Sequence, residues 1–305
     1  MEKMKLIVPT IPKDVGKLLQ NLDLYFKFLP INEICVIGSD ELETLLPSDY
    51  PIVFIDEKEL VDFNAIKNLI VKRTKKNEAG SRAGWYVQQF IKMAFARICQ
   101  ADYYLLWDSD TVPLKPVNMI EEDRPVFDCK TEYHEAYFKT LEKLFPNLRK
   151  CIKGSFISEH MIIKTSLMRQ MLNEIEANVN LDGANFAEKI INAVAVEELT
   201  GSGFSEFETF GTYVYSRYLD AYGLRKWKSM RFGGFFFDCG NGLSEETVNW
   251  LSSYYDAISF EKGDDVSAVS RIVGSLEYEK KFKANTLEVW AFSVRVCRKI
   301  RRILG

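Results

Sequence analysis

The amino-acid sequence predicts an α/β fold built around a mostly parallel β-sheet. The first observation is that short apolar runs alternate with segments of helical periodicity before residue 110, a rhythm typical of strands that pair in parallel. The second is that each run ends in polar or turn-forming residues, as strands do at the edge of a sheet. The third is a hydrophobic content of 47%, which is enough for a substantial core.

Each element follows from a local pattern. The predicted strands are short runs rich in β-favouring residues, whereas the helices repeat apolar residues at intervals of three and four. In order, the first elements are a strand at 5–10, a helix at 15–29, strands at 33–38 and 51–56, a helix at 81–100 and a strand at 103–107. Residues 153–172 predict a strand and then a helix, and 201–223 contain a further helix.

The domain organisation is predicted to be simple. No linker rich in Pro, Gly or Ser divides the chain, so one domain is expected over 1–285, with halves of about 1–116 and 117–285. Residues 286–305 predict a basic amphipathic helix with an apolar stripe of Val289, Phe292, Val296, Ile300 and Ile303. Such a helix either lies on an anionic membrane surface or packs on the domain, and the sequence leaves both open.

The composition excludes several classes of protein. A net charge of −3 gives no basic field, so no nucleic-acid partner is expected. No apolar stretch reaches the ~20 residues that span a bilayer, and the N-terminal run is too short for a signal peptide. The six cysteines form no CxxC pair, which favours free thiols in a reducing cytoplasm. Two histidines, His134 and His160, are too few for a His-rich metal centre.

The stretch YYLLWDSDTVPLKP (103–116) carries the most specific chemistry. An apolar strand runs into Asp108 and Asp110, whose side chains at i and i+2 can converge at the strand exit. Two carboxylates at one point repel each other unless a cation offsets their charge. Mg²⁺ or Mn²⁺, which prefer oxygen ligands, would offset it and could also hold a diphosphate.

Three interpretations of this motif compete. The first is the metal and diphosphate site of a glycosyltransferase. The second is a phosphatase of the haloacid dehalogenase type, with Asp108 as nucleophile, Asp110 as acid or base and GDD at 263–265 as its acidic motif. The third is a solvated strand end. Such phosphatases usually open with this strand, whereas three strand signals precede it here, so position favours the glycosyltransferase. A non-catalytic sugar-nucleotide-binding protein is a further alternative.

Four segments carry a family resemblance: GWYVQQFIKM, YYLLWDSDTVPLKP, SEHMIIK and FSEFETFGTYV. Over about residues 5–240 the chain resembles bacterial GT-A glycosyltransferases associated with surface-polysaccharide synthesis. The resemblance implies a GT-A fold, a nucleotide-diphosphate sugar donor, commonly UDP-linked, and Mn²⁺ or Mg²⁺ at Asp108 and Asp110. It also implies a glycan or lipid-linked glycan acceptor, and a cytoplasmic protein that is at most peripheral on the inner face of the plasma membrane.

The same resemblance implies a set of donor-binding residues. These are Pro9, Thr10, Asp56, Arg82, Gln88, Gln89, Lys92 and Ser109. Many GT-A enzymes, chiefly retaining ones, take a third metal ligand from a late histidine. No histidine follows His160 in this sequence, so water, phosphate or Asp238 would complete the shell, and an inverting enzyme is favoured.

Inverting transfer needs a carboxylate that deprotonates the acceptor hydroxyl. Glu206 and Glu208 both open the helix in 201–223, and Ser205 with Glu208 forms an S-x-x-E capping box that accounts for Glu208. Glu206 lies off the apolar stripe of this helix, so it is the predicted general base; the alternative is an acidic residue that only favours the helix start. Contacts with acceptor or sugar are predicted for His160, Glu208 and Asp238.

Overall fold

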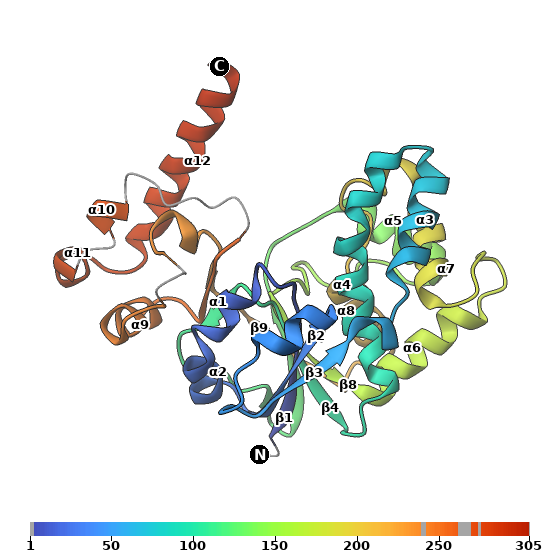
Figure 1. Cartoon of the computed structure of the whole chain (residues 1–305), viewed down its shortest axis with the longest axis horizontal. Helices are drawn as coiled ribbons and strands as arrows, with labels where there is room; N and C mark the ends of the chain where they lie inside the picture. Colours follow the sequence, from blue (N-terminus) through green and yellow to red (C-terminus); the bar gives the residue numbers. More distant parts are fainter. Residues whose placement is uncertain (1–2, 239–241, 262–269, 274–275, 305) are drawn as a thin grey trace. The chain divides into compact units, whose positions relative to one another are not determined.

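The computed structural model describes residues 3–238, 242–261, 270–273 and 276–304 (Figure 1). The chain divides into two compact units, each made of several segments. Unit 1 comprises Met1–Pro12, Ile31–Asp108 and Met119–Lys226, and unit 2 comprises Lys13–Pro30, Ser109–Asn118 and Trp227–Gly305. The chain therefore passes from unit 1 to unit 2 within the DSD motif, between residues 108 and 109.

A five-stranded sheet forms the centre of unit 1. Its strands, in the order β3-β2-β1-β4-β8, are β3 (Ile52–Asp56), β2 (Ile31–Gly38), β1 (Met4–Pro9), β4 (Tyr103–Trp107) and β8 (His160–Lys164). The first four run parallel, and β8 pairs antiparallel with β4. Leu6, Ile7 and Val8 in β1 are fully buried, because helices and loops cover both faces of the central strand. The predicted α/β fold with a mostly parallel sheet is confirmed.

Helices of unit 1 lie together beside this sheet in Figure 1. They are α3 (Phe63–Thr74), α4 (Ala83–Ala94), α5 (Glu135–Leu144), α6 (Thr165–Ala177), α7 (Phe186–Ala193) and α8 (Glu206–Arg217). Short 3₁₀ helices lie in the connections between the strands and helices of unit 1. They are η1 (Asp40–Leu45), η2 (Glu57–Glu59), η3 (Asn77–Arg82), η4 (Phe95–Arg97) and η5 (Val196–Glu198). A second sheet, in the order β6-β7-β9, contains β6 (Ile120–Glu121), β7 (Arg124–Cys129) and β9 (Gly223–Lys226).

Unit 2 contains a small sheet and its own apolar core. The sheet order is β10-β11-β5, from β10 (Ser229–Met230), β11 (Ala257–Ser259) and β5 (Thr111–Pro113). Its helical elements are η6 (Gly233–Phe235), α9 (Glu245–Ser252), α10 (Ser270–Val273), α11 (Leu276–Lys281) and α12 (Thr286–Leu304). Val112, Leu114 and Ile258 lie in a core that also takes in buried side chains of α9 and α12.

The helix predicted at 15–29 is two helices, α1 (Val15–Leu19) and α2 (Leu22–Phe28), and both belong to unit 2. The interruption lies at Asn21, whose side chain donates a hydrogen bond to the Lys17 carbonyl at 2.8 Å. A short side chain that bonds to the local backbone competes with continuous helix at such a position. The hydroxyl of Tyr25 in α2 donates to the Thr111 carbonyl at 2.7 Å, which joins α2 to β5.

The predicted C-terminal helix is present as α12, but its packing face differs from the predicted stripe. Among the side chains of this helix that the structure describes, those of Leu287, Ala291 and Val294 are buried. The predicted residues Val289, Phe292, Val296 and Ile300 are exposed, and the side chain of Ile303 lies outside the described part of the chain. Within that part, no helix is both long enough and apolar enough to cross a bilayer.

One packing contact in unit 1 gives a direct stability test. A Cβ added at Gly211 in α8 would lie 2.3 Å from Cγ of Phe156, a fully buried side chain. We expect Gly211→Ala to lower the free energy of unfolding by about 1–3 kcal/mol through overpacking, measured by urea denaturation. Gly84→Ala in α4 is the matched control, because no atom lies within 4 Å of its added Cβ. That control should gain up to ~1 kcal/mol from helix propensity, and equal behaviour of the two variants would contradict the prediction.

Candidate functional site

The candidate site lies at the carboxyl ends of β1 and β4. Strand order reverses at β1, because β2 and β3 lie on one side of it and β4 on the other. Ligands of open parallel sheets bind at such a reversal, beyond the carboxyl ends of the strands. Thr10 follows β1 and Asp108 follows β4, so two residues predicted from the sequence stand at this edge.

Lys92 forms the centre of the site. Its ammonium lies 2.6 Å from Oδ1 of Asp108 and 2.8 Å from Oε1 of Glu206. The Lys92 and Glu206 side chains are 3% and 6% exposed, whereas that of Asp108 is 27% exposed. Burial alone would lower the pKa of Lys92, but the two carboxylates outweigh it and raise that pKa above its ordinary value. Lys92 is therefore a fixed positive charge between two carboxylates.

Two helices and β4 hold this cluster in place. Gln89 stands one turn before Lys92 in α4, and its Oε1 accepts a hydrogen bond from the Glu206 backbone N–H at 3.1 Å. The Tyr104 hydroxyl in β4 donates to the Lys92 carbonyl at 3.0 Å. Ser205 caps α8, since its hydroxyl accepts from the backbone N–H of Glu208 at 3.2 Å. The structure thus brings together four predicted residues, namely Gln89, Lys92, Asp108 and Glu206.

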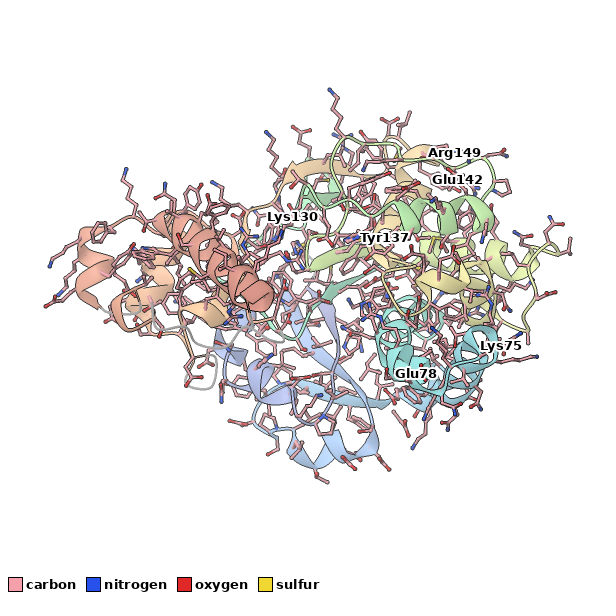
Figure 2. The ribbon with its side chains drawn as sticks, turned by 90° about the horizontal axis from the view of Figure 1, so that it is seen from above. Lys75, Glu78, Lys130, Tyr137, Glu142 and Arg149 are labelled. Atoms are coloured by element: carbon pink, nitrogen blue, oxygen red, sulfur yellow. The ribbon has the colours of Figure 1, made fainter. Side chains whose placement is uncertain are left out.

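The backbone at Asp108 is fixed by a residue that sequence reasoning missed. The Asp108 N–H donates to the Glu159 carbonyl at 2.9 Å. Glu159 has a φ of 64°, a left-handed conformation that costs an ordinary residue about 1–2 kcal/mol. Its side chain pairs with Lys130, labelled in Figure 2, at 2.5 Å. No sequence signal marks this pair, because a positive φ outside glycine has no reliable motif.

The donor set fits a hard cation that keeps water or phosphate ligands. One oxygen of Asp108 contacts Lys92, and the partial exposure of that carboxylate leaves it accessible from solvent. In the described part of the chain, no three Asp, Glu, His or Cys side chains are grouped as a complete metal cage. Mg²⁺ is commonly bound by one or two carboxylates with substrate phosphates and water, so the partly exposed Asp108 carboxylate suits it.

Thr10 and Asp56, two further residues predicted to bind the donor, both make hydrogen bonds within unit 1. The Thr10 N–H donates to the Ile37 carbonyl at 3.0 Å, and Pro9, just before it, is buried. Asp56 ends β3, and its side chain accepts from the Lys58 N–H at 2.9 Å. Gly38 ends β2 at a point where an added Cβ would lie 2.4 Å from the Thr10 carbonyl oxygen, so only glycine fits there.

Arg82 precedes the first residue of α4, and Gln88 lies in the middle of that helix. The Arg82 guanidinium donates to the Gly201 carbonyl at 3.0 Å and lies 4.0 Å from the ring centroid of Trp85. Burial lowers the pKa of Arg82 from its ordinary value. Gln88 is half-buried on the same helix. Arg82 thus supports the loop that precedes α8, and its predicted donor contact stays a prediction.

The side chain of Glu208 does not make the hydrogen bond that the predicted capping box requires. Its Oε2 accepts from the Ser155 hydroxyl at 2.6 Å and from the Phe156 N–H at 3.1 Å, so the side chain points away from the cap. Burial raises the pKa of Glu208. The Ser205 half of the box is correct, whereas the reciprocal half is wrong because Ser155 supplies a buried partner.

His160 is enclosed within unit 1. Its Nε2 lies 2.8 Å from Oδ2 of Asp128, its Nδ1 lies 2.9 Å from the Ser158 carbonyl, and its ring stacks on Trp107. Asp128 also binds Arg225 through both oxygens at 2.7 Å. Both ring nitrogens of His160 therefore have protein partners.

Three predicted residues belong to unit 2. The Asp110 carbonyl accepts from the Phe260 N–H at 2.8 Å, which ties the residue to the end of β11. Ser109 is half-buried, and Asp238 is exposed near the end of the segment after η6. The GDD sequence at 263–265 lies outside the described residues.

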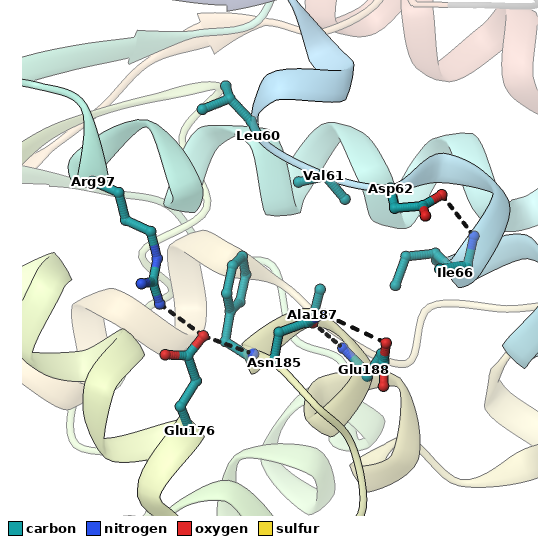
Figure 3. A pocket seen from close by; sticks show the side chains of 11 residues that line it. Leu60, Val61, Asp62, Ile66, Arg97, Glu176, Asn185, Ala187 and Glu188 are labelled. Carbon is teal, nitrogen blue, oxygen red and sulfur yellow. Dashed lines mark hydrogen bonds and ion pairs between the residues drawn. The ribbon is translucent and has the colours of Figure 1, made fainter.

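A separate pocket of about 240 Å³ lies in unit 1 (Figure 3). Its polar groups serve local structure: Arg97 pairs with Glu176 at 2.7 Å, Asp62 caps α3 and Asn185 caps α7. None of the predicted site residues lines this pocket.

Comparison with known families assigns most of the chain. A family model described as "Family of unknown function (DUF6492)" matches residues 17–231. The chain belongs to this family. Among curated proteins, no sequence matches it. The DUF6492 model covers α4, β4 and α8, so all four residues of the Lys92 cluster lie within the family region.

Solved structures of glycosyltransferases are similar to this DUF6492 chain at low identity. Mouse xyloside xylosyltransferase 1 in its apo form is 10% identical, with 87% of this chain and 100% of that chain covered and a TM-score of 0.43. The galactosyltransferase LgtC, in complex with donor and acceptor sugar analogues, is 10% identical. The match covers 85% of this chain and 88% of that chain, with a TM-score of 0.40.

A third structure is the apo form of the glycosyltransferase GlyE from Streptococcus pneumoniae TIGR4. It is 10% identical, with a TM-score of 0.40, and the match covers 96% of this chain but 64% of that chain.

Proposed function

We propose that the protein is a metal-dependent, GT-A-type glycosyltransferase that transfers a hexose from a nucleotide-diphosphate sugar, preferably a UDP-sugar. The acceptor proposed is a glycan or lipid-linked glycan in surface-polysaccharide synthesis. The proposed place of action is the cytoplasm, with peripheral contact to the inner face of the plasma membrane through α12. The observation that carries the proposal is the buried contact of Lys92 with Asp108 and Glu206 at the strand-order reversal.

The electrostatics of this cluster suit a diphosphate leaving group. In the proposal, Asp108 and Asp110 hold Mn²⁺ or Mg²⁺, which when bound would offset the negative charge of the departing nucleoside diphosphate. Lys92 is a fixed ammonium between Asp108 and Glu206, so it offsets part of the negative charge of these two carboxylates where the diphosphate would bind. Pro9, Thr10, Asp56, Arg82, Gln88, Gln89 and Ser109 complete the proposed donor side.

The proposed chemistry is inverting transfer with Glu206 as general base. The acceptor hydroxyl gives its proton to the Glu206 carboxylate while its oxygen bonds to C1 of the donor sugar, and the bond from C1 to the phosphate oxygen breaks. Gln89 and Lys92 fix the backbone and one carboxylate oxygen of Glu206. Such positioning matters because a base must stand within hydrogen-bond reach of the proton that it removes.

The proposed acceptor-side residues differ in whether they can contact the acceptor directly. Asp238 is exposed and could contact sugar or a metal-bound water. His160 and Glu208 are 1% and 3% exposed, so they would influence the acceptor through the residues that they hold. For His160 these are Asp128 and Trp107, and for Glu208 they are Ser155 and the backbone of Phe156.

The first experiment measures thermal stabilisation by nucleotide and metal. We expect UDP at 100 times its dissociation constant to stabilise the protein by about 2.7 kcal/mol when Mn²⁺ or Mg²⁺ is present, and much less with a chelator. Asp110→Ala should lose the metal-dependent part. Asp49→Ala, at an exposed loop carboxylate, is the control and should respond as the wild type does.

The outcomes separate the alternatives. No response to any nucleotide would overturn the proposal. Hydrolysis of a generic phosphomonoester that Asp108→Asn abolishes would favour the phosphatase, with Asp108 as its nucleophile. Nucleotide-sugar binding without turnover, over a panel of glycan acceptors, would favour a non-catalytic binding protein.

A further inference from the structure

Helix α12 presents apolar side chains on two opposite faces. One face contains Leu287, Ala291 and Val294, which are 0%, 3% and 8% exposed and lie in the core of unit 2. Their spacing of four and three residues is that of a single helical stripe. This stripe, together with the partly buried Trp290, packs the helix on the core of unit 2.

The other face contains Val289, Phe292, Val296 and Ile300. These side chains are 68%, 62%, 39% and 48% exposed, and they repeat at intervals of three, four and four residues. Single exposed apolar residues are normal on protein surfaces. A contiguous row of them, in contrast, indicates a surface that binds a protein or a membrane. We call these four residues the outer row.

The charge along α12 indicates what covers the outer row. Arg295 and Lys299 are exposed and stand three positions after Phe292 and Val296, so they border the row on one side. Within residues 286–304 the sequence contains five basic residues and a single acidic one, Glu288. Arg295 lies over the ring of Phe232, 4.6 Å from its centroid, and Arg298 lies over the ring of Phe235, 4.3 Å from its centroid. These contacts hold this part of α12 against the segment around η6.

We propose that the outer row of α12 inserts into the interface of an anionic lipid bilayer, with its basic neighbours at the headgroups. An apolar stripe bordered by Arg and Lys is the pattern of helices that lie in the membrane plane. Each basic residue near such a surface adds about 1 kcal/mol of attraction. A second copy of α12 fits less well, because pairing through the outer row would bring Arg295 and Lys299 of both helices together.

This proposal extends the proposed function by naming the surface and its lipid chemistry, and it requires no transferase activity. The test is flotation of the full chain with phosphatidylcholine vesicles that contain or lack phosphatidylglycerol. We expect binding to the anionic vesicles only, weakened by salt. The variant Phe292→Ser/Val296→Ser/Ile300→Ser should bind at least about tenfold less, because the lost apolar area is what enters the bilayer.

Matched controls separate the outer row from general effects. Val179→Ser/Leu219→Ser removes two other exposed apolar side chains, 92% and 68% exposed, and should leave binding unchanged. Lys299→Glu should weaken binding, whereas Lys72→Glu, an exposed charge in α3, should not. Because all the outer-row side chains are exposed, their variant should keep the wild-type melting temperature.

Two results would overturn the proposal. One is equal flotation of the wild type and the outer-row variant on anionic vesicles. The other is a concentration-dependent dimer that the outer-row variant abolishes, together with no vesicle binding, which would assign the row to a second copy of the chain. Neither measurement involves nucleotide or metal, so the proposed transferase activity stands or falls separately.

Discussion

Replacing Lys92 by methionine is expected to lower the free energy of unfolding by about 3–5 kcal/mol, measured by urea denaturation. Methionine keeps most of the length of the side chain and removes its charge. The change leaves the carboxylates of Asp108 and Glu206 without the ammonium that now lies 2.6 and 2.8 Å from them. Glu206 is largely buried, so water replaces the lost partner poorly.

A compensated variant distinguishes charge from packing. Lys92→Met combined with Asp108→Asn and Glu206→Gln has no uncompensated charge in the cluster and should regain much of the lost stability. Lys72→Met, at an exposed position in α3, should change stability by less than ~0.5 kcal/mol. If Lys92→Met unfolds at the wild-type urea concentration, the buried ion pairs do not hold this site.

Glu206→Gln is expected to lower the rate of sugar transfer by about 10²- to 10⁴-fold, the usual contribution of a general base. Glutamine keeps the shape of the side chain, and its amide oxygen can still accept the hydrogen bond of Lys92. The backbone bond from residue 206 to Gln89 is independent of the side chain. The variant should therefore fold normally and keep its nucleotide-dependent stabilisation while it fails to activate the acceptor.

Glu208→Gln is the matched comparison for that variant. Both glutamates are buried in the first turn of α8, but Glu208 is bonded to Ser155 and the Phe156 backbone. Transfer by Glu208→Gln should fall much less than transfer by Glu206→Gln, because Glu208 acts only through Ser155 and the backbone of Phe156. Near-normal transfer by Glu206→Gln would refute the assignment of the base, and an equal loss in both variants would indicate a general disturbance of α8.

Local patterns predicted much of unit 1. The strand segments at 5–10, 33–38, 51–56 and 103–107 correspond to β1, β2, β3 and β4 within a few residues. Parallel strands end at a common edge, and this rule alone places Thr10 and Asp108 together. The helical spacing of the apolar residues Val87, Phe90 and Ile91 puts Lys92 on the opposite face of its helix, and in the structure Lys92 is buried there by the contacts of the site.

Contacts between distant residues could not be predicted in the same way. Lys92 and Glu206 are 114 positions apart, and nothing in either segment names the other as its partner. Ser155 competes with the cap for Glu208, a choice that depends on tertiary packing. In α12 both faces are apolar, so periodicity finds two stripes and cannot decide which one packs.

The discontinuity of unit 2 has a consequence for biosynthesis. Its core joins Val112 and Leu114 to Met230 and Ile258, residues that leave the ribosome much later. A chain that emerges from its N-terminus can assemble the sheet strands of unit 1 first, while Val112, Leu114 and their neighbours still lack the later residues of their core. We therefore expect ribosome-bound chains that stop before residue 227 to recruit chaperones that bind exposed apolar segments, and chains extended past residue 261 to release them.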